Sequence, residues 1–344
     1  MHILFLHFGE CKGLNNDVAV LNDYAHALGQ MYKFNVTTEI ISVDSKTVDY
    51  NYDDDDQSLI YYGKFVADIV IHIQDIFKLR NISYEDAINI LIPNPEWTNQ
   101  ITSNRVQLID QIWHKTYYSQ AVFENAYRGL TSIEHFYLGF TTMDRKEARV
   151  KNFDFIGHFR GGGVARNTDK IVNIWMRRPD FPLLRLKFHS SDPNIYFLQL
   201  LDWFSVKNIE FKYGFSSDEE YFFDLTSSSG VHICTSEVEG FGHYINESRM
   251  VGAVPIVING FPMCELVDET SGYLIEPNEI MPMNYGLRYK ITEEALENKI
   301  EEILKDPMDV LVEKGRKARK KYEDDRITFV RNFHLALQNI LIKL

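Results

Sequence analysis

Strand-like and helix-like segments alternate along the whole 344-residue chain, and this alternation constrains the fold more than any other feature. The first series opens with an apolar strand at His2–Phe8, a loop at Gly9–Asn16 and a helical pattern at Asp17–Tyr32. A second series begins with a strand at Phe153–Gly157 and a helix with Thr168 as its expected N-cap. Strands that alternate with helices predict parallel sheets covered by helices. We therefore expect an α/β protein with two Rossmann-like, doubly wound domains.

The remaining segments follow the same alternation and set the expected domain boundaries. We expect further strands at Val36–Val43, Asp68–Ile73, Ile88–Ile92, Ser132–Leu138, Leu183–Phe188, Ile209–Tyr213, Val231–Thr235 and Pro255–Ile258. We expect further helices at Ser217–Leu225 and Tyr244–Val251, and closing helices interrupted near Pro307 and Asp324. This pattern predicts an N-terminal domain over residues 1–150, a C-terminal domain over 151–325 and a final helix over 326–344. Functional residues are expected directly after strands, because ligands of such sheets bind at the carboxyl ends of the strands.

Composition and charge limit the classes of partner. Hydrophobic residues make up 45% and charged residues 25% of the chain, as in ordinary soluble globular proteins. A formal net charge of -13 repels a phosphate backbone, so nucleic acid is disfavoured as a partner without being excluded. One basic cluster lies between Lys314 and Lys321, beside the acidic run Glu323–Asp325. It has two interpretations, a solvated helix face and a surface that binds an anionic membrane or a polyanionic acceptor.

The cysteines and the apolar segments bear on location. Cys11, Cys234 and Cys264 lie far apart and form no C-x-x-C pair, which predicts neither a disulfide framework nor a zinc site. Such cysteine usage is typical of a reducing compartment. The apolar segment Met1–Phe8 is too short for a signal peptide, and no stretch approaches the roughly 20 apolar residues of a membrane span. We therefore expect a cytoplasmic protein, and the basic cluster leaves peripheral membrane binding open.

The densest functional signal is the segment Ser236–Glu247, which reads S-E-V-E-G-F-G-H-Y-I-N-E. It leaves a strand, crosses a glycine turn and enters a helix, with Glu239 before the turn and Glu247 eight positions later. Glycines let backbone N–H groups approach a ligand, and a helix N-terminus favours negative charge. Carboxylates suit sugar hydroxyls because they accept charge-assisted hydrogen bonds. The alternative is an ordinary strand-to-helix turn with surface glutamates.

Further motifs flank this segment on both sides. Downstream are G-A-V-P-I-V-I at Gly252–Ile258, M-C-E-L-V at Met263–Val267 and G-Y-L-I at Gly272–Ile275. Upstream are F-I-G-H-F-R at Phe155–Arg160 and R-N-T-D-K at Arg166–Lys170. Over residues 153–276 the motifs resemble the C-terminal half of retaining GT-B glycosyltransferases of the large E-x7-E family. This glycosyltransferase family 4-like group includes sucrose and glycogen synthases and mannosyltransferases. The N-terminal half resembles the family only in architecture.

The resemblance implies a fold and an activity. The GT-B fold has two Rossmann-like domains facing across a cleft, here an acceptor domain over residues 1–150 and a donor domain over residues 151–325. The helix at 326–344 would pack back on the N-terminal domain. The implied reaction moves a hexose or pentose from a UDP- or GDP-sugar to an acceptor hydroxyl with retention of anomeric configuration. It needs no metal and no cofactor beyond the nucleotide-sugar cosubstrate, and the acceptor would be a glycan, a lipid-linked molecule or another hydroxyl compound.

The resemblance also implies roles for individual residues. Arg160 and Arg166 would hold the donor diphosphate, with Arg166 standing where the family more often has lysine. Glu239 would bind the hydroxyls of the donor sugar, and Glu247 those of the ribose. Further donor-binding residues would be Gly240, Phe241, Gly242 and His243 at the glycine turn, Gly214 and Phe215 beside the base, and Gly9 in the N-terminal half.

The N-terminal half offers weaker candidates. The turn Ile92–Trp97 follows a strand, so Trp97 could stack on a sugar ring while Asn94 and Glu96 bind acceptor hydroxyls. Its alternative is a rigid turn bracketed by prolines. The acidic run Asp53–Asp56 has no strand leading into it, and we expect no metal site there.

Three other functions stay open at this point. The chain could be a glycosyltransferase that acts on a modified DNA base, as in some phages, which salt-sensitive duplex binding would reveal. It could be a nucleotide-sugar-binding protein without catalysis, or a sugar phosphorylase or epimerase on a similar fold. Both arginines and the complete E-x7-E motif favour a working transferase.

Overall fold

The computed structural model describes most of the chain, in two compact units. The described residues are 1–9, 12–43, 67–76, 87–98, 106–129, 132–145, 148–150, 152–160, 165–188, 206–214, 216–217 and 220–343. Unit 1 comprises Met1–Met143, Met283–Gly286 and Arg326–Leu344, and unit 2 comprises Asp144–Pro282 and Leu287–Asp325. The expected boundary at residue 150 lies within unit 2, where the Val150 N–H donates to the Val251 carbonyl at 2.9 Å.

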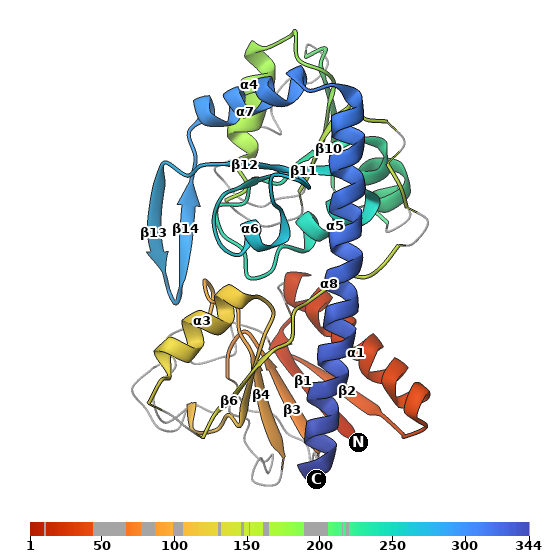
Figure 1. The fold of residues 1–344 in the computed structure, drawn as a ribbon, viewed down its shortest axis with the longest axis vertical. Coiled ribbons are helices and arrows are strands. Elements are labelled where there is room, and N and C mark those ends of the chain that lie inside the picture. The colour runs from red at the N-terminus through yellow and green to blue at the C-terminus, as the bar shows by residue number, and fades with distance from the viewer. Residues whose placement is uncertain are drawn as a thin grey trace. The chain divides into compact units, whose positions relative to one another are not determined.

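Unit 1 is built on a six-stranded parallel sheet with the strand order β2-β1-β3-β4-β5-β6 (Figure 1). Its strands are β1 (His2–Phe8), β2 (Thr37–Val43), β3 (Ile69–Ile73), β4 (Ile88–Ile92), β5 (Gln111–His114) and β6 (Glu134–Tyr137). Strands β3 and β4 are apolar runs buried on both faces, as a parallel sheet covered by helices requires. Every strand expected in this half is present with small shifts at its ends, and β5 is an addition.

Helix α1 (Lys12–Tyr32) packs on β1, β2 and β3. It begins before the position expected from the sequence, so the predicted loop at Gly9–Asn16 is wrong for most of its length. Leu14 is buried and extends the apolar face of Val18 and Leu21 by one turn toward the N-terminus. Polar neighbours around Leu14 hid this turn of the helix from the sequence pattern.

Three aromatic side chains complete the core beneath α3 (Tyr117–Ala126). The ring of Tyr285 lies 4.9 Å from that of Phe123, and its hydroxyl lies 3.2 Å from the Tyr127 hydroxyl. The Tyr285 N–H also donates to the Pro95 carbonyl at 2.9 Å. These contacts explain why Met283–Gly286, far along the chain, belongs to unit 1.

The last part of α8 (Met308–Lys343) supplies a second aromatic cluster to unit 1. Phe329 packs edge-on against Tyr24 and close to Phe140, with both ring centroids 5.2 Å away. Phe333 meets the fully buried Trp113 at right angles, 5.9 Å between ring centroids. Burial of such large rings contributes strongly to stability, so this part of the helix is integral to unit 1.

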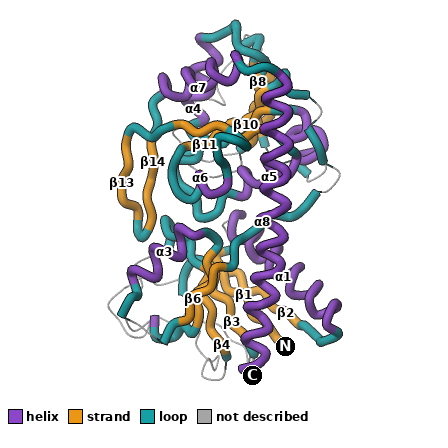
Figure 2. Tube along the Cα trace, viewed as in Figure 1, coloured by secondary structure: helices purple, strands orange, loops and turns teal. Residues whose placement is uncertain are grey.

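Unit 2 contains a second six-stranded parallel sheet, with the order β12-β11-β10-β7-β8-β9. Figure 2 shows strands of this sheet in orange among the purple helices of the unit. Its strands are β7 (Ile156–Phe159), β8 (Leu184–Phe188), β9 (Ile209–Tyr213), β10 (Val231–Ile233), β11 (Val254–Ile258) and β12 (Tyr273–Ile275). A separate two-stranded sheet of β13 (Glu279–Met283) and β14 (Gly286–Lys290) was not expected from the sequence. Two parallel sheets with flanking helices confirm the predicted α/β, doubly wound fold class.

The helical segments of unit 2 are α4 (Thr168–Arg177), η3 (Glu220–Leu225), η4 (Thr226–Ser228), α5 (His243–Val251), α6 (Met263–Leu266) and α7 (Glu293–Lys305). The start of α4 differs from the sequence prediction. Thr168 is the first helical residue and not the N-cap, because Asn167 takes that position in a left-handed conformation with φ +56°. The segment expected as a helix from Ser217 is helical at Glu220–Leu225, where it is a π-helix, and the Ser217 hydroxyl accepts the Glu220 N–H at 3.2 Å.

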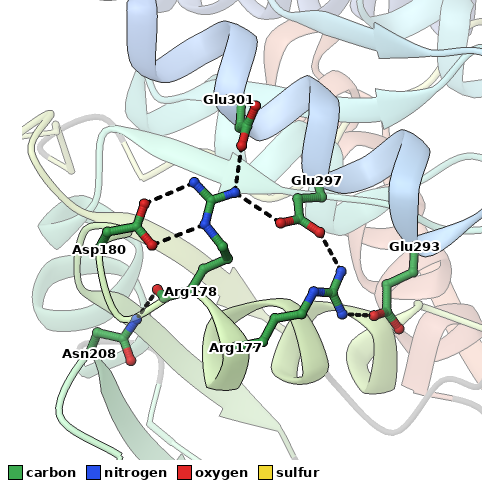
Figure 3. Close-up of polar contacts among 7 residues, drawn as sticks. All are labelled: Arg177, Arg178, Asp180, Asn208, Glu293, Glu297 and Glu301. Carbon is green, nitrogen blue, oxygen red and sulfur yellow. Dashed lines mark hydrogen bonds and ion pairs between the residues drawn. The ribbon is translucent and has the colours of Figure 1, made fainter.

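Ion pairs join α4 to α7 (Figure 3). Arg177 pairs with Glu293 and Glu297, and Arg178 contacts Glu297 at 2.9 Å and Glu301 at 2.5 Å. The three glutamates recur every four residues and therefore share one face of α7. The hydrogen bonds that Arg178 makes to Asp180, Glu297 and Glu301 raise its pKa, so its guanidinium stays charged.

Helix α8 is continuous from Met308 to Lys343, so the interruption predicted near Asp324 is wrong. Its charged residues stabilise the helix through pairs one turn apart, since Arg319 pairs with Glu323 and Lys320 with Asp324. This pairing fits the solvated-face interpretation of the basic cluster. No helix in the described part of the chain is both long enough and apolar enough to cross a bilayer.

Candidate functional site

The strand order of unit 2 locates a candidate ligand site. From β7 the chain adds β8 and β9 on one side, then returns to place β10 on the other side of β7. Ligands of doubly wound sheets bind at the carboxyl ends of the strands where the order reverses. Arg160 directly follows β7, and Cys234 directly follows β10. The segment with both candidate arginines and the segment with both candidate glutamates therefore leave the sheet on either side of this reversal point.

A glycine makes the sharp entry from β10 into α5 feasible. Gly242 is the N-cap of α5 with φ +94°, a left-handed conformation that favours glycine. A Cβ there would also lie 3.0 Å from the Ile245 side chain. Phe241 is buried and meets the His243 ring edge-on at 5.3 Å. The glycine loop (Ser236–Gly242) thus directs the first N–H groups of α5 toward the carboxyl edge of the sheet, where they suit an anion.

Arg166 and Glu239 meet directly. The Arg166 guanidinium donates to Glu239 Oε1 and to the Ser236 hydroxyl. Ser236 Oγ donates to Glu239 Oε1 at 2.6 Å, and the Tyr244 hydroxyl donates to Ser236 Oγ at 2.9 Å. The guanidinium carbon also lies 4.2 Å from the centre of the Tyr244 ring, a favourable cation–π distance. These contacts hold both charged side chains in defined positions.

The electrostatics of this pair keep Arg166 cationic. Burial acts to lower the pKa of Arg166, but the charge of Glu239 and the hydrogen bonds of Tyr244 and Glu239 outweigh it and raise the pKa. The Arg166 side chain is 21% exposed and that of Glu239 is 10% exposed. Neither side chain is fully enclosed, so a polar ligand can contact each of them.

Arg160 is held by a chain of hydrogen bonds that the sequence analysis did not foresee. Its Nη1 donates to Thr168 Oγ1 at 3.2 Å, and His158 Nε2 lies 2.9 Å from the same oxygen. Burial lowers the pKa of His158 to about 3, and the positive charges of Arg160 and Arg166 contribute. The neutral ring must donate from Nδ1 to the Ile233 carbonyl at 2.8 Å, so Nε2 accepts the Thr168 hydroxyl proton. Thr168 is thereby oriented to accept from Arg160.

Glu247 has a partner from a different element. The Tyr221 hydroxyl, on the π-helix η3, donates to Glu247 Oε2 at 2.9 Å. Burial raises the pKa of Tyr221 well above its ordinary value, and the charge of Glu247 adds to this effect. Single π-helical turns often occur at functional sites. No local sequence signal identifies Tyr221, because its role depends on a contact with a residue 26 positions away.

The four charged residues predicted from the sequence influence the pKa values of two buried side chains, Cys234 and His158. Burial raises the pKa of the Cys234 thiol, and Glu239 and Glu247 reinforce this effect while Arg166 opposes it. The positive charges of Arg160 and Arg166 both lower the pKa of His158. The hydrogen bonds agree with this, since Arg166 donates to Glu239, and the Tyr221 hydroxyl that donates to Glu247 also lies 3.5 Å from the Phe159 carbonyl at the end of β7, next to Arg160.

Of the two candidate residues beside the nucleotide base, the structure describes Gly214. Gly214 follows β9 with φ +109°, and among the described residues other than its chain neighbours no atom lies within 4 Å of where its Cβ would be. Its N–H donates to the Phe188 carbonyl at 3.2 Å. Phe215 lies outside the described residues, as does the acidic run Asp53–Asp56.

The remaining candidates belong to unit 1. At Gly9, a Cβ would lie 2.7 Å from Ser42 Cβ, so the glycine allows close approach to β2. Asn94 and Glu96 are buried, and the Asn94 carbonyl accepts from the N–H groups of Trp97 and Thr98. Trp97 is 43% exposed, so it alone of these three turn residues presents a large surface.

A metal site finds no support among the residues that the structure covers. Across the described ranges, no group of three or more His, Cys, Asp or Glu side chains is arranged to hold an ion. A cavity of about 350 Å³ lies elsewhere in unit 2, beside Gly252 at the far end of α5 from the glycine loop. Arg319 lines it together with Glu323, its ion-pair partner.

Comparison with known proteins identifies the fold. No protein-family model matches the chain, and no curated protein matches it in sequence. The structure is similar to HepE from Anabaena, solved in complex with UDP and glucose, with a TM-score of 0.63, 14% identity and 100% of each chain covered. It is similar to a glycosyltransferase from Rickettsia africae ESF-5, with a TM-score of 0.66, 15% identity and 99% and 98% of the two chains covered. A sucrose-phosphate synthase from Thermosynechococcus elongatus gives a TM-score of 0.65 at 12% identity, with 100% and 98% covered. The chain therefore has the GT-B fold.

Proposed function

We propose that the chain is a glycosyltransferase that moves a sugar from a UDP- or GDP-sugar to an acceptor hydroxyl. The observation that carries this proposal is that Arg160 and Arg166 follow β7 while Glu239 and Glu247 follow β10, on the two strands where the order of the unit 2 sheet reverses, with Arg166 bonded to Glu239. The GT-B fold adds support, since HepE with the same fold was solved with UDP-glucose as well as with UDP and glucose. Fold alone does not determine function, so the site carries the argument.

In this proposal the arginines bind the donor diphosphate. Negative charge on the diphosphate grows as the bond to the sugar breaks, and fixed positive groups stabilise that charge in the transition state. Arg166 and Arg160 supply this stabilisation from the ends of the sheet, so the step needs no metal ion. The N–H groups at the start of α5 reinforce it.

The contact between Arg166 and Glu239 suggests an order of events. A diphosphate competes with Glu239 for the Arg166 guanidinium, because both are anions that accept the same N–H groups. Donor binding would thus release Glu239 toward the hydroxyls of the donor sugar. Ser236 and Tyr244 keep the carboxylate near its position during this exchange.

We infer retention of the anomeric configuration from the same site. The acceptor oxygen bonds to the anomeric carbon on the face from which the diphosphate departs. The proton of the acceptor hydroxyl passes to a donor phosphate oxygen, so the nucleoside diphosphate leaves with the bonding electrons and the charge balances. A retaining hydrolase would instead need two carboxylates in acid and nucleophile roles. Here both glutamates are assigned to hydroxyl binding.

A thermal-shift panel of UDP-, GDP- and ADP-sugars tests the proposal, because a ligand that binds only the native state raises the melting temperature. We expect a UDP- or GDP-sugar to stabilise the protein, and NMR of the product to show the retained anomer. Glu239→Ala should lower turnover at least ~100-fold with the fold intact. Glu269→Ala, an exposed position, serves as the control.

Two outcomes would overturn the proposal in different ways. If no nucleotide sugar raises the melting temperature, the proposed donor site is wrong. Stabilisation without turnover, for glycan, lipid-linked and simple hydroxyl acceptors alike, would identify a nucleotide-sugar-binding protein instead.

A further inference from the structure

Glu237, two positions before Glu239, is a buried carboxylate with a cation at each oxygen. Arg288 on β14 donates to Glu237 Oε2 from Nε at 2.8 Å and from Nη2 at 2.6 Å. Lys170 Nζ on α4 lies 3.7 Å from Glu237 Oε1. The Glu237 side chain is 7% exposed, whereas Arg288 is 38% exposed.

The backbone of Glu237 is bonded to two further segments. Its N–H donates to the Ala165 carbonyl at 3.0 Å, and its carbonyl accepts the Tyr289 N–H at 2.7 Å. Glu237 therefore connects the glycine loop to the segment that carries Arg166 and to strand β14.

Two further hydrogen bonds join the same segments. The Thr235 hydroxyl donates to the Arg166 carbonyl at 3.2 Å, and Asn167 Nδ2 donates to the Thr235 carbonyl at 2.8 Å. The relative position of Arg166 and Glu239 thus depends on a short ladder of bonds, and Glu237 lies at one end of it. Ala165 and Asn167 both have positive φ, which makes this segment dependent on such external bonds.

We propose that Glu237 and Arg288 are positioning residues for sugar transfer. This inference rests on the proposed function of the glycine loop. The ion pair fixes the glycine loop on β14, and the ladder then sets Glu239 opposite Arg166. Both oxygens of Glu237 face cations, so it does not bind the donor itself. A misplacement of about 1 Å at a reacting group costs about 100-fold in rate, so a small shift of this loop is sufficient for a large effect.

The test compares Arg288→Gln, Glu237→Gln and the double variant with the wild-type protein, by kinetics with the donor identified in the thermal-shift panel. We expect each single variant to lose about 10- to 100-fold in kcat/KM, mainly in kcat, because the transition-state geometry is disturbed. The double variant should be no worse than either single variant, because the two residues act as one unit. Arg288→Lys should restore part of the loss because it keeps the charge.

Lys290→Gln is the matched control. Lys290 lies on the same strand, has a similar exposure of 36% and pairs at 3.1 Å with Glu279 of β13, which is not part of the glycine loop. Its kcat/KM should stay within about twofold of wild type. Melting temperatures of all variants separate unfolding from misplacement.

Three results would overturn the inference. If Arg288→Gln and Glu237→Gln match the Lys290→Gln control, the pair has no positioning role. If only Arg288→Gln weakens binding of free UDP or GDP, Arg288 is a direct ligand of the nucleotide. If the wild-type protein neither binds nor turns over a nucleotide sugar, the proposed function and this inference both fail, whereas the first two results leave the proposed function intact.

Discussion

Arg160 shows how a single buried charge can indicate a function. Its side chain is 2% exposed, and its Nη1 bonds to the neutral hydroxyl of Thr168. Arg160 directly follows β7, at the reversal of the strand order, where ligands of doubly wound sheets bind. A guanidinium in that position suits a diphosphate, because it can donate two parallel hydrogen bonds to phosphate oxygens.

Arg160→Ala should lower sugar transfer at least ~100-fold, as the loss of a transition-state contact commonly does. The melting temperature should change little, because the Thr168 hydroxyl keeps His158 as a partner. Steady-state kinetics and thermal melts measure the two effects separately. Arg185→Ala on β8 is the control. If Arg160→Ala transfers sugar as fast as Arg185→Ala, the role assigned to Arg160 is wrong.

At the scale of elements, the packing of α8 on the end of α5 depends on two glycines. Gly252 ends α5 with φ +80°, and Gly315 of α8 faces its carbonyl. A Cβ at Gly315 would lie 2.3 Å from the Gly252 oxygen, which is backbone and has no rotamer to change. The close approach of these two elements therefore requires glycine at position 315.

Gly315→Ala should destabilise unit 2 by about 1–3 kcal/mol, the usual cost of forcing an extra carbon into a packed contact. Helix propensity alone predicts the opposite sign, since alanine is favoured over glycine by about 1 kcal/mol inside a helix. Urea denaturation decides between the two effects. Gly129→Ala is the comparison, because no described residue beyond its chain neighbours has an atom within 4 Å of the added Cβ. If Gly315→Ala is as stable as the wild type or more stable, the packing argument is wrong.

At the scale of the whole molecule, both units bury neutral histidines. Burial lowers the pKa of His72 to about 4 and of His114 to about 3 in unit 1. It also lowers the pKa of His158 to about 3 and of His232 to about 4 in unit 2. The unfolded chain, with a histidine pKa of about 6.5, therefore binds more protons than the folded one between about pH 4 and pH 6.5.

The free energy of unfolding should be constant above about pH 6.5 and should fall as the pH drops below it. Each of these histidines contributes up to about 1.4 kcal/mol per pH unit in that range. Urea denaturation at pH 7.5, 6.5 and 5.5 measures the slope, and His232→Asn should make it shallower. Stability that stays level or rises from pH 6.5 to 5.5 would show that these histidines are protonated in the folded protein.

Local patterns in the sequence were sufficient to predict the fold class and to select the charged residues of the candidate site. Strand and helix periodicities are properties of consecutive residues, so most strands and the α4 and α5 helices were predicted within a few positions. The glycine loop is local as well, since Glu239, Gly242 and Glu247 lie within one strand-to-helix turn. The start of α1 and the continuity of α8 were predicted wrongly, because polar and acidic runs resemble loops until their packing is known.

Only the tertiary structure decided which distant residues meet. The pairing of Tyr221 with Glu247 and of Arg288 with Glu237 joins elements far apart in the chain. The order of strands that puts β7 beside β10 is likewise invisible to any window of neighbouring residues. Periodicity reports which face of an element is apolar and says nothing of which other element covers it. The chemistry of each side chain was therefore readable from the sequence, whereas its partners depended on long-range packing.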